Sequence, residues 1–263
     1  MKYLFSSFLI IYSFSSLFAQ NTYLLPRSFF PQKGEMVEIG GFYGKGFDTI
    51  KAKRVPVSQF SGATLYASGK PVDLLPAGTK NTQNYLSVQL NNPGICLVAA
   101  KKELLVPDLD REDVIRQLAD EGFNSLASKA GDKEEMSVNN IFSSKTLLMV
   151  NKPSGGYYEE KTGHDLEIVL MQNPYKMKYG EDLTVQILFR GKPLAQSKAE
   201  VYTRTLNGTI FVGDNVTDAD GKLYIKLNRS GDWMIKAINA EAASQGADYN
   251  HWCSTYTFGF RSE

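Results

Sequence analysis

The chain has 263 residues, with 29 Lys or Arg against 28 Asp or Glu; 43% of the residues are hydrophobic and 12% are aromatic. This composition excludes a disordered chain, which has few aromatic residues and a high net charge. Two cysteines exclude a disulfide scaffold and a four-cysteine zinc site. The formal charge of +1 provides no basic surface for nucleic acid, so we expect no nucleic-acid partner.

Residues 1–19 have the layout of a secretory signal peptide. Lys2 precedes an apolar run from Tyr3 to Phe18, and Ala19 supplies a small residue at the cleavage site. The run is shorter than the roughly 20 apolar residues that span a bilayer, which disfavours a membrane anchor. No cysteine lies near the cut to carry a lipid. We therefore expect a mature protein that is periplasmic or secreted and does not span a membrane.

An internal repeat divides the mature sequence. Residues 86–100 read LSVQLNNPGICLVAA, and residues 223–237 read LYIKLNRSGDWMIKA. Each copy predicts a hairpin of two strands joined by a turn with Gly near its end. Gly-Glu and Gly-Lys-Pro motifs precede the repeat in both halves, at 34–35 and 69–71 in the first and at 180–181 and 191–193 in the second. Tandem duplication and convergent turn chemistry both remain open explanations.

The second half shows period-two alternation of apolar residues, which is typical of strands with one buried face. Leu183, Val185, Ile187 and Phe189 alternate with mostly polar neighbours, and short runs of this kind are separated by Gly, Asn and Asp turns. This pattern predicts antiparallel sandwiches. We expect an all-β fold of two β-sandwich domains, 20–152 and 160–263, joined by the linker 153–156.

A short helical insertion is predicted in the first domain, at about 108–130. Asp108 or Asp110 can cap a helix over 111–121, and Gly122 can end it. Residues 123–130 have the composition of a second short helix. Residues 141–150, of which 146–150 are strongly apolar, predict the strand that leads into the linker.

Several motifs in fixed order resemble an uncharacterised family of bacterial exported proteins. They are Thr162-Gly163-His164-Asp165, Asn173-Pro174-Tyr175, Gly180-Glu181, Gly191-Lys192-Pro193-Leu194, Thr217-Asp218-Ala219-Asp220-Gly221 and Gly231-Asp232-Trp233. Members of that family are commonly described as periplasmic components of nickel or cobalt uptake systems. The resemblance implies Ig-like or transthyretin-like sandwiches, the C-terminal one also similar to carboxypeptidase regulatory domains. It also implies a role in metal handling.

The chain departs from that family at its mature N-terminus. Many members have a histidine directly after the cleavage site, where its imidazole and the free amine can hold a metal ion. Here Gln20 and Asn21 follow Ala19. Cyclisation of Gln20 would remove the amine as well, so we expect the N-terminal metal site to be absent.

The remaining candidate metal ligands are His251, Cys253 and His164, since nickel, cobalt, copper and zinc prefer imidazole and thiolate. His251 and Cys253 are two residues apart on one predicted strand, so both side chains can reach one ion. The alternative is that His251 is an exposed polar residue and Cys253 a small, half-buried one. His164 has no ligand spacing and suits a surface position.

The cysteines are expected to be unpaired. The repeat places Cys96 in register with Trp233, which predicts an inward-facing position, whereas Cys253 is predicted to face outward in the other domain. A disulfide between them would have to cross the domain interface.

No catalytic motif is present, so we expect no enzyme. The sequence has no Gly-x-Ser-x-Gly, His-Glu-x-x-His or phosphate-binding glycine motif. Two functions of different class remain. One is a periplasmic accessory protein that binds a transition metal or docks on a membrane metal transporter or outer-membrane receptor. The other is a structural or carbohydrate-contacting module of the cell envelope, with Tyr157, Tyr158 and Tyr249 as exposed contact residues.

Overall fold

The computed structural model describes residues 20–75 and 84–262, so the predicted signal peptide, 1–19, lies outside the described residues. The described chain is mostly β-strand, arranged in several antiparallel sheets, as the alternation of apolar residues predicts. In chain order the strands are β1 (Asn21–Pro26), β2 (Met36–Gly44), β3 (Lys53–Val55), β4 (Gly62–Tyr66), β5 (Val72–Asp73), β6 (Tyr85–Gln89), β7 (Gly94–Asp110), β8 (Glu135–Val150), β9 (Leu166–Leu170), β10 (Asp182–Phe189), β11 (Lys192–Pro193), β12 (Lys198–Arg204), β13 (Ile210–Val216), β14 (Lys222–Lys226), β15 (Gly231–Ala242) and β16 (Tyr249–Phe260).

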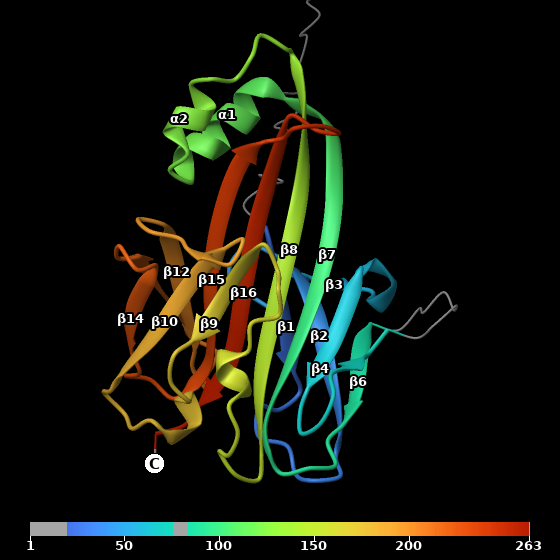
Figure 1. Ribbon diagram of the computed structural model, residues 1–263, viewed down its shortest axis with the longest axis vertical. Coiled ribbons are helices and arrows are strands. Elements are labelled where there is room, and N and C mark those ends of the chain that lie inside the picture. Colours follow the sequence, from blue (N-terminus) through green and yellow to red (C-terminus); the bar gives the residue numbers. More distant parts are fainter. Residues whose placement is uncertain (1–19, 76–83, 263) are drawn as a thin grey trace, which may run out of the picture.

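One long sheet forms the centre of the molecule, with the strand order β13-β12-β15-β16-β8-β7-β4-β5. Its four longest strands, β7, β8, β15 and β16, run along the long axis in Figure 1. The first half of the chain is joined to the second by the parallel pairing of β8 with β16, from Val138 beside Tyr249 to Thr146 beside Thr257. Both predicted domains, 20–152 and 160–263, therefore contribute strands to one sheet; their independence as folding units stays a prediction.

Two smaller sheets pack on opposite faces of the central sheet. One consists of β1, β2, β3 and β6, and the other of β9, β10, β11 and β14. The first covers a core that includes Leu24, Ile39 and Leu148, and the second covers a core that includes Ile168, Val185 and Trp252. Both faces of the central strands are thus buried, which explains why nearly every residue of β16 and of the second half of β8 is buried, polar residues such as Ser144 and Thr255 included.

The internal repeat is confirmed as a structural repeat, although its strands do not form hairpins. In each copy the first strand, β6 or β14, lies in a small sheet, and the second, β7 or β15, lies in the central sheet. Backbone bonds recur between the copies: Gly34 and Gly180 donate to Leu90 and Leu227 at 2.7 and 2.8 Å. These equivalent bonds favour tandem duplication. The Gly-Lys-Pro motifs are not equivalent, because 69–71 precede β5 of the central sheet, whereas Lys192 and Pro193 form β11 and pair with β10 of a small sheet.

The backbone conformation explains why glycine occupies the turn in each copy of the repeat. Gly94 and Gly231 have φ angles of +130° and +146°, which other residues rarely adopt. A Cβ atom at Gly231 would lie 2.2 Å from the carbonyl oxygen of Arg204. The backbones therefore approach each other too closely for any side chain there.

The helical insertion is confirmed. Helix α1 (Arg111–Asp120) is capped at its N-terminus by Asp110, whose side chain accepts hydrogen bonds from the backbone N–H groups of Glu112 and Asp113. The shorter α2 (Asn124–Ala127) follows it, and both lie at one end of the central sheet (Figure 1). Val114 and Leu118 pack onto that end with Tyr249.

A buried ion pair fixes β9 and the segment before it to the central sheet. The Lys145 ammonium donates to a Glu167 carboxylate oxygen at 2.7 Å and to the carbonyl oxygens of Glu160 at 2.8 Å and Ile168 at 3.1 Å. The Lys145 and Glu167 side chains are 2% and 4% exposed. Glu167 also accepts a hydrogen bond of 2.8 Å from the Thr162 hydroxyl. All three ammonium protons therefore have acceptors, as a buried charge requires.

Candidate ligand-binding site

The predicted metal ligands His251 and Cys253 lie on the same face of β16, but that face is buried. The prediction that Cys253 faces outward is wrong, because β1 covers the strand: the Thr255 and Thr257 hydroxyls donate to the carbonyl oxygens of Thr22 and Leu24 at 2.8 and 2.7 Å. Cys253 is 1% exposed and His251 is 3% exposed. The alternative interpretation, an exposed His251, is also wrong, because Glu121 at the end of α1 covers that part of β16.

His251 is bonded to a carboxylate that the sequence did not point to. Its Nε2 atom lies 2.9 Å from an oxygen of Glu121, the residue that caps the C-terminal end of α1. Burial acts to raise the pKa of Glu121, but the charge and hydrogen bond of His251 prevail and hold that pKa below its ordinary value. The contact attaches the helical insertion to the central sheet.

Both cysteines are free and buried, which confirms the prediction of two unpaired thiols. Cys96 faces the core, as its register with Trp233 predicts. Burial raises the pKa of each thiol to about 12. Since the thiolate is the form that binds metals, both groups are poor ligands in the folded protein.

His164 does not join His251 and Cys253. It precedes β9, on the opposite face of the central sheet, near Lys145 and Glu167. Burial, together with the charge of Lys145, lowers the pKa of His164 to about 4. Within residues 20–75 and 84–262, no three His, Cys, Asp or Glu side chains are grouped as metal ligands. The three predicted ligands therefore do not assemble into one site in the described structure.

The three tyrosines that were predicted to be exposed contact residues are buried or half-buried. Tyr249 is buried at 5% exposure, so its predicted exposure is wrong. Tyr157 and Tyr158 are half-buried against the core, and the Tyr157 hydroxyl donates to the carbonyl oxygen of Ala67. Tyr157 and Tyr158 therefore pack the segment before β9 against the central sheet.

A large cavity lies elsewhere, between the β1–β2 sheet and the ends of β12, β15 and β16. Its volume is about 990 Å³, at the upper end of the roughly 300–1,000 Å³ of small-molecule sites. Four arginines and two carboxylates line it, which gives a net charge of +2. They are Arg27, Arg54, Arg204, Arg261, Glu38 and Asp232. The cavity therefore concentrates positive charge on a chain that is otherwise nearly neutral.

Two of these arginines have no carboxylate partner among the described residues. The guanidinium group of Arg54 lies 4.1 Å from the centre of the Phe42 ring, and that of Arg261 lies 3.9 Å from the centre of the Phe30 ring. Stacking uses the flat face of a guanidinium and leaves its N–H donors at the edge. Gly40 gives Arg54 its room, since a Cβ there would lie 2.1 Å from an Arg54 nitrogen.

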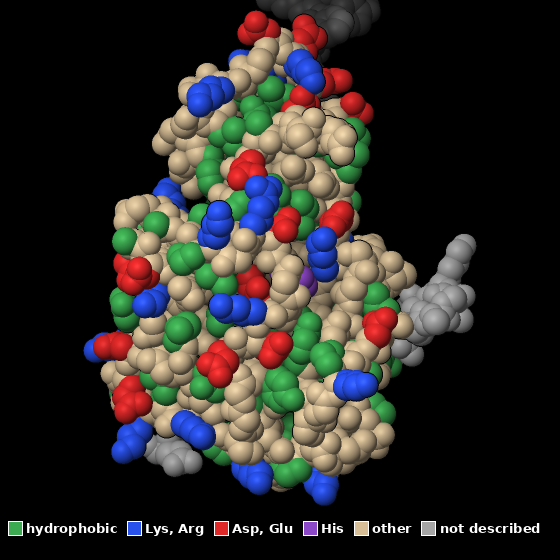
Figure 2. Space-filling view, viewed as in Figure 1, with side chains coloured by type: hydrophobic (Ala, Val, Ile, Leu, Met, Phe, Trp, Pro, Cys, Tyr) green, Lys and Arg blue, Asp and Glu red, His purple; other side chains and the backbone are tan. Residues whose placement is uncertain are grey.

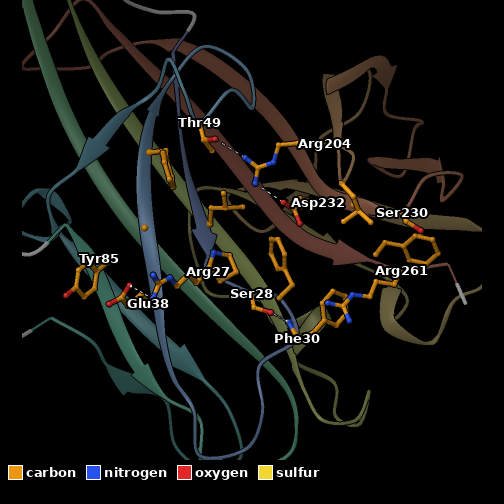
Figure 3. A pocket seen from close by; sticks show the side chains of 18 of the residues that line it. Arg27, Ser28, Phe30, Glu38, Thr49, Tyr85, Arg204, Ser230, Asp232 and Arg261 are labelled. Atoms are coloured by element: carbon orange, nitrogen blue, oxygen red, sulfur yellow. Dashed lines mark hydrogen bonds and ion pairs between the residues drawn. The ribbon is translucent and has the colours of Figure 1, made fainter. Parts of the chain in front are cut away.

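The other two arginines are already paired, as Figure 3 shows. Arg204 donates to Asp232 at 2.7 Å and to the Thr49 hydroxyl at 3.0 Å, which holds the loop after β2 against β12. Arg27 lies 3.7 Å from Glu38, and its side chain is 83% exposed. Among the described residues, Arg54 and Arg261 are therefore the cationic groups of the cavity without an ion-pair partner, and a carboxylate or phosphate is the group they bind best.

Charge elsewhere is mixed. On the face seen in Figure 2, acidic and basic side chains are interspersed over the small β9–β10 sheet and the helical insertion.

In residues 20–75 and 84–262, no helix has the length and apolarity needed to cross a membrane.

The family of the chain is shown by its sequence. Residues 17–241 match the profile of DUF4198, a domain of unknown function. The chain belongs to the DUF4198 family. The search of curated proteins found no match.

Two solved structures are similar to this DUF4198 chain at low scores. A tetra-tandem repeat from the extending region of a large adhesion protein is 12% identical, with a TM-score of 0.25; the match covers 93% of this chain and 50% of that one. The D0–D1 domain of intimin is 10% identical, with a TM-score of 0.22, and the match covers 92% and 98%. The chain thus spans about half the length of the adhesion-protein structure. Scores this low support no inference about fold or function.

Sequence reasoning missed the arginine cavity because its residues have no regular spacing. Arg27, Arg54, Arg204 and Arg261 come from four distant segments. One usable signal is the aromatic residues that lie near Arg27 and Arg261 in Ser28-Phe29-Phe30 and Phe258-Gly259-Phe260.

Proposed function

We propose that this protein is an exported, non-catalytic binding protein of the cell envelope that captures a carboxylate-bearing ligand in the arginine-lined cavity. The observation that carries the proposal is the pair of guanidinium groups, Arg54 and Arg261, that stack on aromatic rings and lack a carboxylate partner among the described residues. The exposed ring of Tyr85 also lines the cavity, and an aromatic ring together with cationic donors suits a ligand with a flat apolar side and an anionic group, such as an acidic saccharide.

The resemblance to nickel and cobalt uptake components is compatible with this proposal in one specific form. The cavity would take the metal as cargo inside an anionic complex, such as nickel citrate, and not as a bare ion. This form is favoured because His251 is bonded to Glu121 and the Cys253 thiol has a pKa of about 12. Docking on a membrane transporter or outer-membrane receptor is part of the same proposal. An Ig-like or transthyretin-like origin of each half likewise stays a proposal.

Isothermal titration calorimetry on the mature protein tests the proposal. The probes are citrate, nickel citrate and digalacturonate, with a neutral disaccharide as the uncharged control and nickel, cobalt, copper and zinc chlorides as bare ions. We expect binding of at least one anionic probe and none of the neutral sugar. Binding of the bare ions alone would replace the proposal with direct metal capture, and His251→Ala with Cys253→Ser would then show whether the predicted ligands are responsible.

Arginine variants localise the binding. A charge-assisted hydrogen bond contributes about 1.5–3 kcal/mol, so Arg54→Gln or Arg261→Gln should weaken binding by roughly 10- to 100-fold. Arg190→Gln is the matched control, because Arg190 also stacks on an aromatic ring, 4.6 Å from the centre of Phe189, but lies outside the cavity. Equal affinity in the cavity variants and the control would refute the proposed site.

A further inference from the structure

A second cavity, of about 480 Å³, lies between the end of α1, the loop after β2 and the strands β12, β13 and β15. It is separate from the arginine cavity. Gly46 lines the second cavity and Thr49 lines the first, while Phe47 between them is buried at 1% exposure. Its volume is within the range of small-molecule sites.

Charges of both signs line this second cavity. Three lysines and four carboxylates contribute to its wall, and they come from the loop after β2, the end of α1 and three strands of the central sheet. They are Lys45, Lys198, Lys236, Asp120, Glu121, Glu200 and Asp214. A mixed-charge wall suits a ligand that itself carries both charges.

The strand register sets two carboxylates side by side at one end of this wall. Glu200 of β12 pairs directly with Asp214 of β13 on one side and with Lys236 of β15 on the other. Directly opposed residues share a face of the sheet, and like charges in that position repel each other. One oxygen of Glu200 is already used, since it accepts from Lys236 at 2.8 Å and from the Tyr202 hydroxyl at 2.7 Å. Asp214 has no cationic partner among the described residues, so this end of the cavity can take a positive group.

The floor and rim of the cavity offer the opposite charge. Lys236 is 9% exposed, and its ammonium has one acceptor, Glu200, among the described hydrogen bonds. An ammonium has three donors, so two remain for a ligand. Lys45 and Lys198 are exposed at the rim, and neither forms an ion pair within the described residues. A carboxylate between these groups would complete their hydrogen bonding.

We propose that this second cavity binds a free α-amino acid, with its ammonium group at Asp214 and Glu200 and its carboxylate at Lys236 and the rim lysines. The apolar lining provides space for the side chain, since Val216 and Ile238 belong to the wall. Of the two carboxylates at the end of α1, Asp120 is exposed at the rim, whereas Glu121 is occupied by His251 and Gln117 and does not contact the ligand. This site is independent of the arginine cavity and of the proposed function.

The test uses the full mature protein and the twenty common L-amino acids, first by thermal shift at millimolar concentration and then by calorimetry. The best binder is compared with its amide, which lacks the carboxylate charge, and with its N-acetyl form, which lacks the ammonium. Each modification should weaken binding by about tenfold or more, because each removes one charge-assisted contact. The proposal is overturned if no amino acid binds, or if either modified form binds as tightly as its parent.

Two exposed residues provide variants that preserve the fold. Asp214→Asn and Lys198→Gln change groups at the rim and should each weaken the best binder by about tenfold. Asp132→Asn is the matched control, since Asp132 is also exposed but lies in the loop before β8, outside the cavity. Unchanged affinity in Asp214→Asn, with the fold verified by circular dichroism, would also overturn the proposal. Citrate binding at the arginine cavity is measured on the same variants and should not change.

Discussion

Replacement of Lys145 by Met should destabilise the protein strongly, because it leaves a buried carboxylate without its counter-charge. The Lys145 ammonium donates to Glu167 and to two carbonyl oxygens, and the Glu167 side chain is 4% exposed. Removal of one partner of a buried pair costs about 3–5 kcal/mol of unfolding free energy. Met keeps most of the apolar stem, so lost packing contributes little to that figure.

Urea denaturation followed by tryptophan fluorescence measures this loss, since Trp233 and Trp252 are both 2% exposed in the folded protein. The double variant Lys145→Met/Glu167→Gln removes the uncompensated charge and should recover at least about 2 kcal/mol of the loss. Lys226→Met is the matched control: its pair with Asp182 is 60% and 55% exposed, and its loss should cost no more than about 1 kcal/mol. A cost of Lys145→Met no larger than that of the control would refute the reasoning.

Two further predictions concern titration and thiol chemistry. Burial acts to raise the pKa of Glu121, Glu167 and Glu200, yet their bonded His or Lys partners hold each pKa below its ordinary value of 4.5. As the pH falls, the folded state then binds fewer protons than the unfolded state. The contribution of these glutamates to the unfolding free energy should therefore have its full value above about pH 4.5 and decrease below that pH. Urea titrations at pH 7, 5, 4 and 3 check this, and equal values at pH 5 and pH 3 would contradict it. The thiols of Cys96 and Cys253, whose pKa burial raises to about 12, should resist iodoacetamide at pH 8 in the folded protein and react in urea, as mass spectrometry would show; rapid labelling of the folded protein would contradict their burial.

The sequence predicted what depends on local pattern. Strand alternation gave the β-rich fold, and the capping carboxylate at Asp110 with the apolar positions Val114 and Leu118 gave helix α1. The repeat identified equivalent turns at Gly94 and Gly231, because the backbone conformation there requires glycine.

Long-range pairing could not be predicted in the same way. The parallel contact of β8 with β16 joins segments more than 100 residues apart, and no local pattern specifies it. The burial of both faces of β16 also depends on long-range packing. Alternation alone placed Cys253 on an outward face, but β1 covers that face in the folded chain. Strand alternation indicates which residues share a face but not whether a second layer covers that face.

The candidate site depends even more on tertiary structure. Arg54 and Arg261 line the same cavity only because the β1–β2 sheet packs over the ends of β15 and β16. The metal ligands chosen for their chemistry did not assemble, since His164 lies on the opposite face of the central sheet from His251. Residue types suggest a chemistry, but their positions in the fold decide which of them can act together.

The central claim is that the arginine-lined cavity binds a carboxylate ligand, and the most direct measurement is the affinity of citrate, nickel citrate and digalacturonate for the mature protein and its Arg54→Gln/Arg261→Gln variant. We predict saturable binding of at least one of these probes with 1:1 stoichiometry, and a loss of roughly 100-fold or more in the double variant, with the Arg190→Gln control unchanged. Absence of binding by every anionic probe, or equal affinity in the double variant and the control, would contradict the claim.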